Sequence, residues 1–354
     1  MSANTDTIRL GVIGAGGNAR GNTKALVGCG GVEVVAIAEP SPDNFQAFVK
    51  EVGAPDAVQY DARDGYQQML AENDLTAVGI FSPHSLHFEQ AMASLKAGAH
   101  VYCEKPMANG IDSAVTMVEY AEANGLVIGL GYQRHFEAMY ATGRMMIEEG
   151  LIGDIKRFNV FMAQEWNHLD NWRADAELSG GGQVNDSGSH LQDIILWMTQ
   201  LSPKRVRGTV DYLRRGESRE VEVNCYVDVE MDGGATGSVT IEGDHEGNFT
   251  ERINIEGTEG TLRFRPGGLY LMCDGATEEL ELRTMGEGYP SGKQDNFVGN
   301  IRGLHDANHA SGRDGVRTTL LTDMILSLTD RNDIDRDDFL KEKGLTVEQV
   351  TKTG

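Results

Sequence analysis

Short apolar runs alternate with helical patterns from Ile8 to about Leu130, and this alternation constrains the fold more than any other feature. The apolar runs are Ile8–Ile13, Val32–Ala38, Ala77–Phe81, Ala99–Cys103 and Leu126–Leu130. The helical patterns between them span roughly Asn18–Val27, Pro42–Val52, Gly65–Glu72, Leu86–Ala97 and Ile111–Asn124. Short apolar strands separated by helices are typical of a parallel sheet covered on both faces. The sequence therefore predicts a doubly wound α/β domain.

After Phe136 the pattern changes to one of mainly antiparallel strands. The expected strands are Lys156–Ala163, Val221–Met231, Gly234–Glu242, Arg252–Glu256, Thr261–Arg265 and Leu269–Cys273, with turns such as Asp232-Gly233-Gly234 between them. Helices are expected over Ala138–Glu149, Ser189–Thr199, Asp295–Ala310 and Val316–Thr329. Because 354 residues exceed one ordinary core, we predict two domains, 1–134 and 135–354. The acidic stretch from Asp330 is expected to be a partly mobile tail.

Composition narrows the class of protein. A net charge of −23 argues against nucleic-acid binding, which needs a basic surface. Two interpretations of this charge stay open: a surface adapted to salt, or an ordinary acidic enzyme. No apolar run is long enough to span a membrane, and Met1–Thr7 lacks the features of a signal peptide. The four cysteines lie far apart without a CxxC pair, so we expect reduced thiols, no metal site and a cytoplasmic location.

A glycine-rich loop follows the first expected strand. Gly14-Ala15-Gly16-Gly17-Asn18-Ala19 matches the pattern G-x-G-x-x-A, between a strand and a helix. In this pattern Gly14 makes the tight turn, Gly16 lets the backbone approach a pyrophosphate, and Ala19 allows close packing of helix and strand. The helix N-terminus then offers N–H groups to the phosphates. Since the chain has 44 glycines, a purely structural turn is the alternative.

The residue type at the end of the next strand favours NAD as the cofactor. Glu39 lies about twenty residues after the loop, where a carboxylate accepts hydrogen bonds from ribose hydroxyls and repels a 2′-phosphate. We therefore expect NAD rather than NADP; a solvated strand end is the alternative for Glu39. Ser82 and Pro83 follow the third apolar run at the same edge of the sheet, and we expect them to contact the cofactor. His84 and His87 are interpreted as helix-capping residues.

Three polar residues form the candidate catalytic group. Lys105 follows a β-prone segment within Glu104-Lys105-Pro106, at the sheet edge that lines the ligand crevice of doubly wound folds. Asp186 and His190 are four residues apart at the entry of an expected helix, which points both side chains the same way. Together an ammonium, a carboxylate and an imidazole can bind an alcohol or carbonyl oxygen and move its proton. A helix cap for Asp186 and simple packing for His190 are the alternatives.

Two further features near this group have both a functional and a structural interpretation. Trp172 and Arg173, in a polar loop, are candidates to cover a cofactor by stacking and phosphate pairing, or to anchor the loop. Asp193 lies one helical turn after His190 and either orients its imidazole or is merely packed.

With these residues assembled, the chain resembles the Gfo/Idh/MocA oxidoreductases, the group of glucose–fructose oxidoreductase and inositol 2-dehydrogenase. The resemblance covers about residues 8–330. It rests on the glycine loop, Ala99-His100-Val101-Tyr102-Cys103-Glu104-Lys105-Pro106, Gly131-Tyr132-Gln133-Arg134, the run from Asp186 to Asp193, and Gly257-Thr258-Glu259-Gly260. The chain departs from the common pattern in having Glu39 for aspartate and His135 where a second arginine is frequent, which leaves the substrate contacts of that region open.

The resemblance implies a Rossmann domain followed by a domain with a large, open, mainly antiparallel sheet that often forms dimer or tetramer contacts. It implies that Lys105, Asp186 and His190 are catalytic, and that the cofactor contacts Gly14, Gly16, Gly17, Asn18, Ala19, Glu39, Ser82, Pro83, Glu104, Lys105, Trp172 and Arg173. The expected activity is NAD-dependent oxidation of a secondary hydroxyl of a sugar or polyol, or the reverse reduction. A glycosidase that uses NAD without net redox, and a dinucleotide-binding sensor, are the alternatives.

Overall fold

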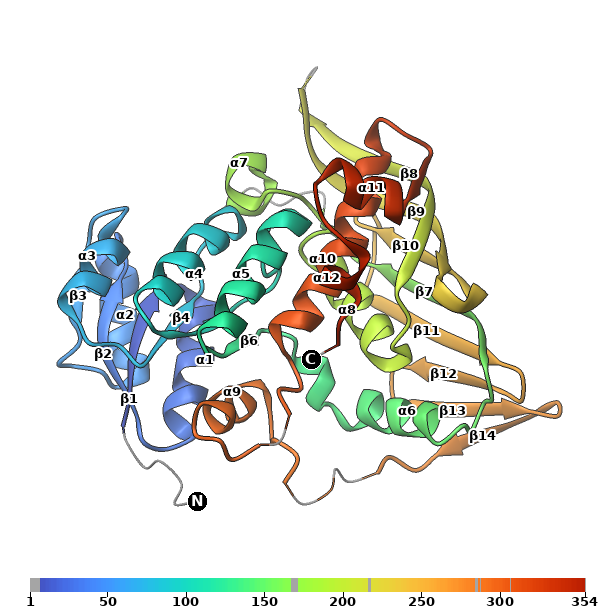
Figure 1. Cartoon of the computed structure of the whole chain (residues 1–354), viewed down its shortest axis with the longest axis horizontal. Coiled ribbons are helices and arrows are strands. Elements are labelled where there is room, and N and C mark those ends of the chain that lie inside the picture. The colour runs from blue at the N-terminus through green and yellow to red at the C-terminus, as the bar shows by residue number, and fades with distance from the viewer. Residues whose placement is uncertain are drawn as a thin grey trace.

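The computed structural model describes residues 7–166, 171–215, 218–283, 286, 288–305 and 307–353. Residues 1–6, on which the signal-peptide expectation rests, lie outside the described residues. Two sheets dominate the fold (Figure 1), and the first one belongs to the N-terminal half.

The first sheet is parallel and has six strands in the order β3-β2-β1-β4-β5-β6. The strands are β1 (Ile8–Ile13), β2 (Val32–Ala38), β3 (Val58–Tyr60), β4 (Ala77–Ile80), β5 (His100–Cys103) and β6 (Ile128–Leu130). This order reverses direction between β1 and β4, which places the ligand crevice of a Rossmann fold at their carboxyl ends. The predicted doubly wound domain is confirmed. The short β3 was not predicted, because Val58–Tyr60 is too brief to form a periodic run.

Helices cover both faces of this sheet. They are α1 (Gly17–Gly28), α2 (Pro42–Val52), α3 (Gly65–Glu72), α4 (His87–Lys96) and α5 (Ile111–Ala123). One buried cluster joins the sheet to α1 and α2 through Leu26 and Phe48. A second cluster joins the opposite face to α3, α4 and α5 through Met69, Leu95 and Val115. Both faces are therefore buried, which explains why the strand sequences are apolar throughout rather than alternating.

The second sheet has nine strands and is antiparallel except where β10 pairs with β7. Its order is β14-β13-β12-β11-β7-β10-β9-β8-β15. The bounds are β7 (Ile155–Ala163), β8 (Pro203–Arg215), β9 (Ser218–Met231), β10 (Thr236–Glu242), β11 (Thr250–Gly257), β12 (Thr261–Arg265), β13 (Gly268–Cys273), β14 (Ala276–Leu280) and β15 (Asp333–Asp335). The predicted large, mainly antiparallel sheet is confirmed.

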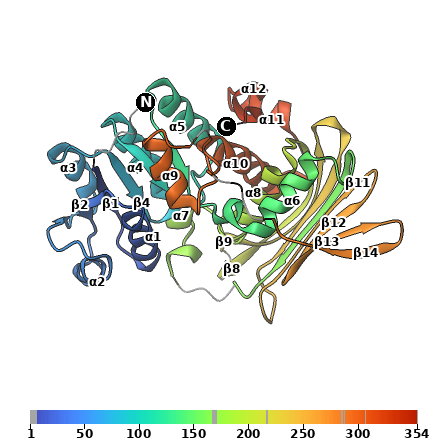
Figure 2. The same ribbon diagram turned by 90° about the horizontal axis from the view of Figure 1, so that it is seen from below.

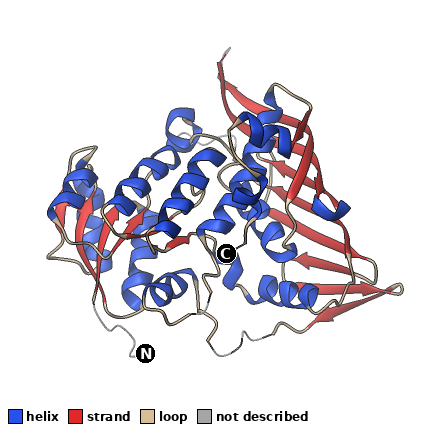
Figure 3. Ribbon diagram, viewed as in Figure 1, coloured by secondary structure: helices blue, strands red, loops and turns tan. Residues whose placement is uncertain are grey.

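Helices pack on one face of this second sheet, and no helix of the described residues covers the other face, called here the bare face (Figures 2 and 3). The packed helices include α6 (Ala138–Glu148), α8 (Gly188–Thr199) and α10 (Gly312–Leu326). In β10 the buried Val239 and Ile241 alternate with the partly exposed Ser238 and Thr240. Such alternation is the sequence signature of a sheet covered on one side. The short helix α7 (Ala176–Ser179) lies in the connection before α8.

Two expectations about the C-terminal part are corrected. The helix expected over Asp295–Ala310 is α9 (Lys293–Ile301), and it ends where Gly303 adopts a positive φ of 67°. Its Phe297 belongs to the buried cluster of the first sheet, so this helix returns to the N-terminal half. The stretch from Asp330, expected to be partly mobile, forms β15, α11 (Arg336–Glu342) and α12 (Val347–Thr351), with Phe339 and Val350 buried.

Candidate active site

The glycine loop between β1 and α1 has the geometry that a dinucleotide requires. Gly14 has a φ of 83°, and a Cβ there would lie 3.0 Å from the backbone of Phe81. A Cβ on Gly16 would project into open space, with nothing within 4 Å. No side chain caps the N-terminus of α1, which begins at Gly17, and Ala19 is fully buried against the sheet. The free N–H groups and the open space beside Gly16 fit the pyrophosphate of NAD.

Glu39 is hydrogen-bonded to the backbone of this loop. The structure buries it at the end of β2, where Oε2 accepts from the Ala15 N–H at 2.7 Å and Oε1 accepts from the Ser41 N–H at 2.8 Å. Each carboxylate oxygen keeps a second lone pair for a ribose hydroxyl. The carboxylate therefore fixes the glycine loop directly, in addition to the ribose contact that its position predicts.

A cavity of about 200 Å³ lies in front of the loop. Its lining combines residues from distant parts of the sequence: Gly16, Gly17, Asn18, Ala19, Phe81, Ser82, His84, His87, Glu104, Lys105, Trp172 and Arg173. Most of the expected cofactor contacts are thus brought together. Gly14, Glu39 and Pro83 are not part of this lining; Gly14 belongs to the loop itself, and Glu39 accepts a hydrogen bond from the Ala15 N–H of the loop.

Asp186 is the centre of a buried charge cluster. Its Oδ1 lies 2.7 Å from Lys105 Nζ, and its Oδ2 lies 2.9 Å from Arg173 Nε. His84 Nε2 is 3.8 Å from Oδ1. Burial alone would raise the pKa of Asp186, but the positive charges of Lys105 and Arg173 outweigh it and hold the pKa well below its usual range. Asp186 is therefore a fixed anion that orients the Lys105 ammonium. The peptide bond between Lys105 and Pro106 is cis.

His190 lies in the first turn of α8, four residues after Asp186. Its Nδ1 is buried and has no hydrogen-bond partner among the described residues. Burial lowers its pKa well below the usual value, and the positive charges of Lys105, Arg134 and Lys293 lower it further, while Asp186 acts in the opposite sense. The imidazole is therefore neutral at neutral pH and available as a base. Asp186 is ion-paired with Lys105 and Arg173, and its charge also raises the pKa of His190, but burial and the positive charges outweigh it.

Asp193 does not orient His190. Its Oδ2 lies 2.8 Å from His135 Nε2, and both side chains are essentially fully buried. His135 also faces the His309 carbonyl at 2.6 Å through Nδ1 and stacks on Trp197 at 4.4 Å. The pair thus joins α8 to the segment after β6, and both ring nitrogens of His135 already face protein partners.

His84 and His87 are not helix caps, contrary to their interpretation above. His87 is fully buried, with Nδ1 2.7 Å from the Pro106 carbonyl and Nε2 3.0 Å from the Ser82 carbonyl. It therefore joins the loop after β4 to the loop that carries Lys105. His84 meets the Trp172 ring edge-on at 4.7 Å. Burial, followed by the charge of His87, lowers its pKa to about 3, so it is neutral beside Asp186.

Two residues of the site were not predicted from the sequence, Lys293 and Glu251. Lys293, from α9, lies 3.1 Å from Glu104 Oε1. Glu251, from β11, accepts from Arg134 Nη2 at 2.6 Å and from the Tyr140 hydroxyl at 2.8 Å. Neither residue stands in a recognisable motif. Each reaches the site from a segment more than a hundred residues away in sequence, so no local pattern reveals it.

Neither a metal site nor a membrane span is found where the structure describes the chain. No cluster of three or more His, Cys, Asp or Glu side chains there is arranged to hold a metal ion. No helix in those ranges has both the length and the apolar character that crossing a membrane requires.

Comparison with protein families matches both halves of the chain. Residues 8–132 match the oxidoreductase family with an NAD-binding Rossmann fold, GFO_IDH_MocA. Residues 140–263 match the GFO/IDH/MocA C-terminal domain.

Curated relatives align over part of the chain. A 1,5-anhydro-D-fructose reductase of Ensifer adhaerens is 31% identical over 55% of this chain and 57% of its own length. A D-xylose 1-dehydrogenase [NADP(+)] of Haloarcula marismortui is 27% identical over 60% and 61%. A levoglucosan dehydrogenase of Pseudarthrobacter phenanthrenivorans is 26% identical over 64% of each. The chain thus spans about 57 to 64% of these relatives' lengths.

Solved structures share the fold over nearly the whole chain. A levoglucosan dehydrogenase in complex with NADH and levoglucosan has a TM-score of 0.79 at 21% identity, covering 93% of this chain and 99% of that one. An inositol dehydrogenase homolog from Azotobacter vinelandii complexed with NAD+ has a TM-score of 0.79 at 23% identity, covering 94% and 98%. Both support the same two-domain architecture.

Proposed function

This chain belongs to the GFO/IDH/MocA oxidoreductase family, with an NAD-binding Rossmann fold at its N-terminal end, and on that premise we propose that it is an NAD-dependent dehydrogenase. The proposed reaction transfers hydride between the nicotinamide and a secondary hydroxyl or keto group of a sugar, polyol or related compound. Its catalytic residues are Lys105, Asp186 and His190. The observation that carries the proposal is the 2.7 Å Lys105–Asp186 ion pair, whose Lys105 lines the same cavity as the glycine loop.

Each catalytic residue has a role that follows from its surroundings. Bound NAD supplies the hydride acceptor. His190 takes the hydroxyl proton through Nε2, because Nδ1 is buried without a partner among the described residues. Lys105 donates a hydrogen bond to the same oxygen and stabilises the negative charge that develops there. Asp186 keeps the Lys105 ammonium charged and oriented.

The cations of the site favour a neutral substrate. Lys105 and Arg173 are paired with Asp186, Arg134 with Glu251, and Lys293 with Glu104. Arg157, another candidate for binding an anion, lies on the second sheet near Asn159 and Ser238 and is absent from the cofactor cavity. A polyhydroxy compound needs hydrogen bonds rather than free charges, and several relatives are reductases or dehydrogenases named for sugars. A neutral sugar or polyol is therefore the proposed substrate class.

The test is absorbance at 340 nm with purified protein, NAD and a panel of polyols, aldoses and anhydrosugars. NADH formation with one class of compound would support the proposal and identify the substrate group. Glycosides are included because sugar release without net NADH would instead indicate a glycosidase that recycles its cofactor. NADH binding without turnover of any compound would indicate a sensor. The free thiols of Cys29, Cys103, Cys225 and Cys273 support a reducing compartment such as the cytoplasm.

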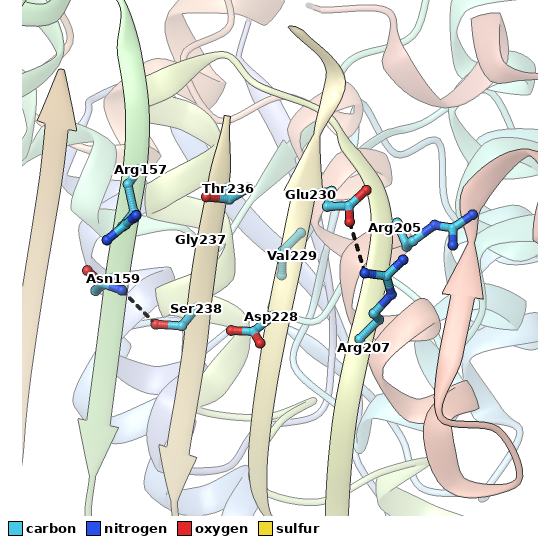
Figure 4. Close-up of a pocket in the computed structure, with 10 residues that line it drawn as sticks. All are labelled: Arg157, Asn159, Arg205, Arg207, Asp228, Val229, Glu230, Thr236, Gly237 and Ser238. Atoms are coloured by element: carbon cyan, nitrogen blue, oxygen red, sulfur yellow. Dashed lines mark hydrogen bonds and ion pairs between the residues drawn. The ribbon is translucent and has the colours of Figure 1, made fainter. Parts of the chain in front are cut away.

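We further infer that the bare face of the second sheet is the contact between two copies of this chain. A cavity of about 470 Å³ lies on this face. Figure 4 shows two of its lining residues, Arg157 on β7 and Asp228 on β9. Both side chains are exposed, and neither forms an ion pair with another described residue. They flank β10, where Arg157 lies opposite Thr236 and Asp228 lies opposite Ser238. A two-fold axis at β10 would bring each Arg157 to the Asp228 of the second copy, because isologous contacts pair each patch with itself.

Light scattering after size exclusion tests this contact. Arg157→Glu is expected to shift the wild-type oligomer towards the monomer, since four acidic groups would then face one another. The charge swap Arg157→Glu with Asp228→Arg is expected to restore the oligomer. A monomeric wild type, or a single variant that assembles normally, would contradict the proposed contact without affecting the proposed reaction.

A further inference from the structure

Lys293 lies in the candidate active site, although it comes from the second half of the chain. It begins α9, and its Nζ is 3.1 Å from Glu104 Oε1 and 3.2 Å from the Gly131 carbonyl oxygen. Glu104 directly follows β5, and Gly131 directly follows β6. The ammonium is therefore held between the carboxyl ends of two neighbouring strands of the Rossmann sheet.

The Glu104 carboxylate depends on this ammonium. Its side chain is 8% exposed, and Oε2 accepts only a long, 3.4 Å bond from the Lys105 N–H. The carboxylate also packs directly on Gly131, where a Cβ would lie 2.8 Å from Oε2. A carboxylate as buried as this is costly without a cation, and Lys293 forms the one ion pair to Glu104 found among the described residues.

The charge of Lys293 matters because Glu104 is adjacent to Lys105 in sequence. The Lys105 ammonium pairs with Asp186 at 2.7 Å rather than with Glu104. Without Lys293, Glu104 would be an unpaired buried carboxylate beside the catalytic loop and would compete with Asp186 for Lys105. The charged groups that act on His190 from the surrounding elements are Lys105, Arg134, Lys293 and Asp186. Loss of Lys293 therefore changes the electrostatic field at both Lys105 and His190.

We propose that Lys293 is a positioning residue for the proposed dehydrogenase reaction: it neutralises Glu104, which leaves Lys105 free to bind Asp186. The inference rests on the proposed function, since hydride transfer is the reaction that Lys105 and His190 would serve. Lys293 itself acts through Glu104 and is not assigned a contact with the reacting atoms.

The placement of α9 does not depend on Lys293, so substitutions there are suitable tests. Gln294 Nε2 donates to Asn22 Oδ1 at 2.7 Å. Phe297 packs on Gly129, where a Cβ would lie 2.7 Å from the ring, and Val298 is buried. These contacts dock the helix on the first domain through apolar burial, and we expect Lys293→Met to fold.

Steady-state kinetics over a range of pH give the first test. Lys293→Met is expected to lower kcat by about tenfold, with affinity for NAD within about twofold of wild type, because the change disturbs general acid–base catalysis rather than binding. The acidic limb of kcat/KM is expected at higher pH in this variant than in wild type, because losing a nearby positive charge raises the pKa of His190. Lys293→Arg should retain most activity. The matched control is Lys156→Met, which removes an exposed lysine at β7 and should leave the profile unchanged.

The double variant Lys293→Met with Glu104→Gln separates charge neutralisation from a simple loss of packing. Because it removes both members of the pair, it is expected to bring the acidic limb back towards wild type. A Lys293→Met variant with the wild-type kcat and pH profile would overturn the proposal. The proposal would also be overturned if the acidic limb of kcat/KM in the double variant lay at the same pH as in Lys293→Met.

An NMR titration distinguishes failure of this inference from failure of the proposed function. The His190 imidazole signal, assigned by its loss in His190→Asn, is expected to titrate at higher pH in Lys293→Met than in wild type. If wild type oxidises no compound but this shift occurs, the proposed reaction fails while the action of Lys293 on His190 stands. If wild type is an active dehydrogenase and His190 titrates identically in both proteins, the inference about Lys293 is wrong.

Discussion

The Lys105 ammonium lies 2.7 Å from Asp186 Oδ1, in a pair whose side chains are 14% and 7% exposed. The pair joins the loop after β5 to the segment before α8, which are separated by 81 residues. The Asp186 carboxylate is paired with Lys105 and Arg173, and His190, whose pKa is lowered mainly by burial, is the uncharged member of the proposed catalytic group. Several outcomes follow from this division of roles.

Lys105→Met should lower kcat by about 10²- to 10⁴-fold, the usual range for loss of a positioned acid or base. NAD binding, measured by the fluorescence of bound NADH, should persist, because the glycine loop and Glu39 are untouched. The folded state should also persist, since Arg173 still pairs with Asp186. Loss of NADH binding with intact folding would remove the catalytic role assigned to Lys105.

The pH dependence of oxidation should show its acidic limb below pH 6.5. Burial, then Lys105, Arg134 and Lys293, lower the pKa of His190 from that ordinary value. The neutral imidazole is the active base, so activity persists as pH falls until His190 becomes protonated. The measurement is kcat/KM against pH, compared with His190→Asn, which should lose the limb together with most of the rate. A limb well above pH 6.5 would show that another group controls the rate.

Glu39 should determine cofactor choice. Wild type is expected to use NAD in preference to NADP, because the carboxylate at the end of β2 repels a 2′-phosphate. Glu39→Ser should narrow this preference by about tenfold or more, which corresponds to roughly 1.4 kcal/mol. It should also weaken NAD binding, since the bonds from the Ala15 and Ser41 N–H groups are lost. Glu33→Ser, at an exposed position of the same strand, is the control; an equal effect there would contradict the assignment.

Glu222 should make the folded protein less stable as the pH rises from about 4.5 to about 7. Burial raises its pKa from 4.5 to about 7, and its Oε1 accepts from the Asn185 N–H at 3.0 Å, beside Asp186. The folded state therefore holds a proton that the unfolded state releases between pH 4.5 and 7. The free energy of unfolding should fall across this window, by about 3 kcal/mol.

Thermal unfolding at pH 5 and pH 8 measures this effect. The difference between the Tm at pH 5 and the Tm at pH 8 should be smaller in Glu222→Gln than in wild type, because glutamine cannot ionise. Glu278→Gln, at an exposed position on β14, should behave as wild type. An unchanged difference in Glu222→Gln would show that other groups cause the pH dependence.

Salt should raise the melting temperature. A net charge of −23 makes the folded chain repel itself, and salt screens that repulsion. Melting curves in low salt and in molar KCl test the two interpretations of the acidic composition. A clear rise would favour a salt-adapted surface, and an unchanged Tm would favour an ordinary acidic enzyme.

The sequence by itself determined the first domain and its cofactor loop. The bounds of β1 and β2 were predicted as Ile8–Ile13 and Val32–Ala38, as observed. Local signals suffice there, because buried parallel strands are continuously apolar and a glycine loop must join the first strand to its helix. Lys105 and Asp186 were also singled out, the first by the strand end before it and the second by its four-residue spacing from His190.

Only the tertiary structure decided how the charges of the site are paired. Spacing along α8 placed Asp193 beside His190, but Asp193 instead meets His135, because α8 packs against the loop after β6. Lys293 reaches Glu104 from 189 residues away, through a helix that returns to the first domain to bury Phe297. Such pairings depend on which elements dock together, and apolar packing that spans the whole chain sets that docking. A local pattern of residues cannot encode it.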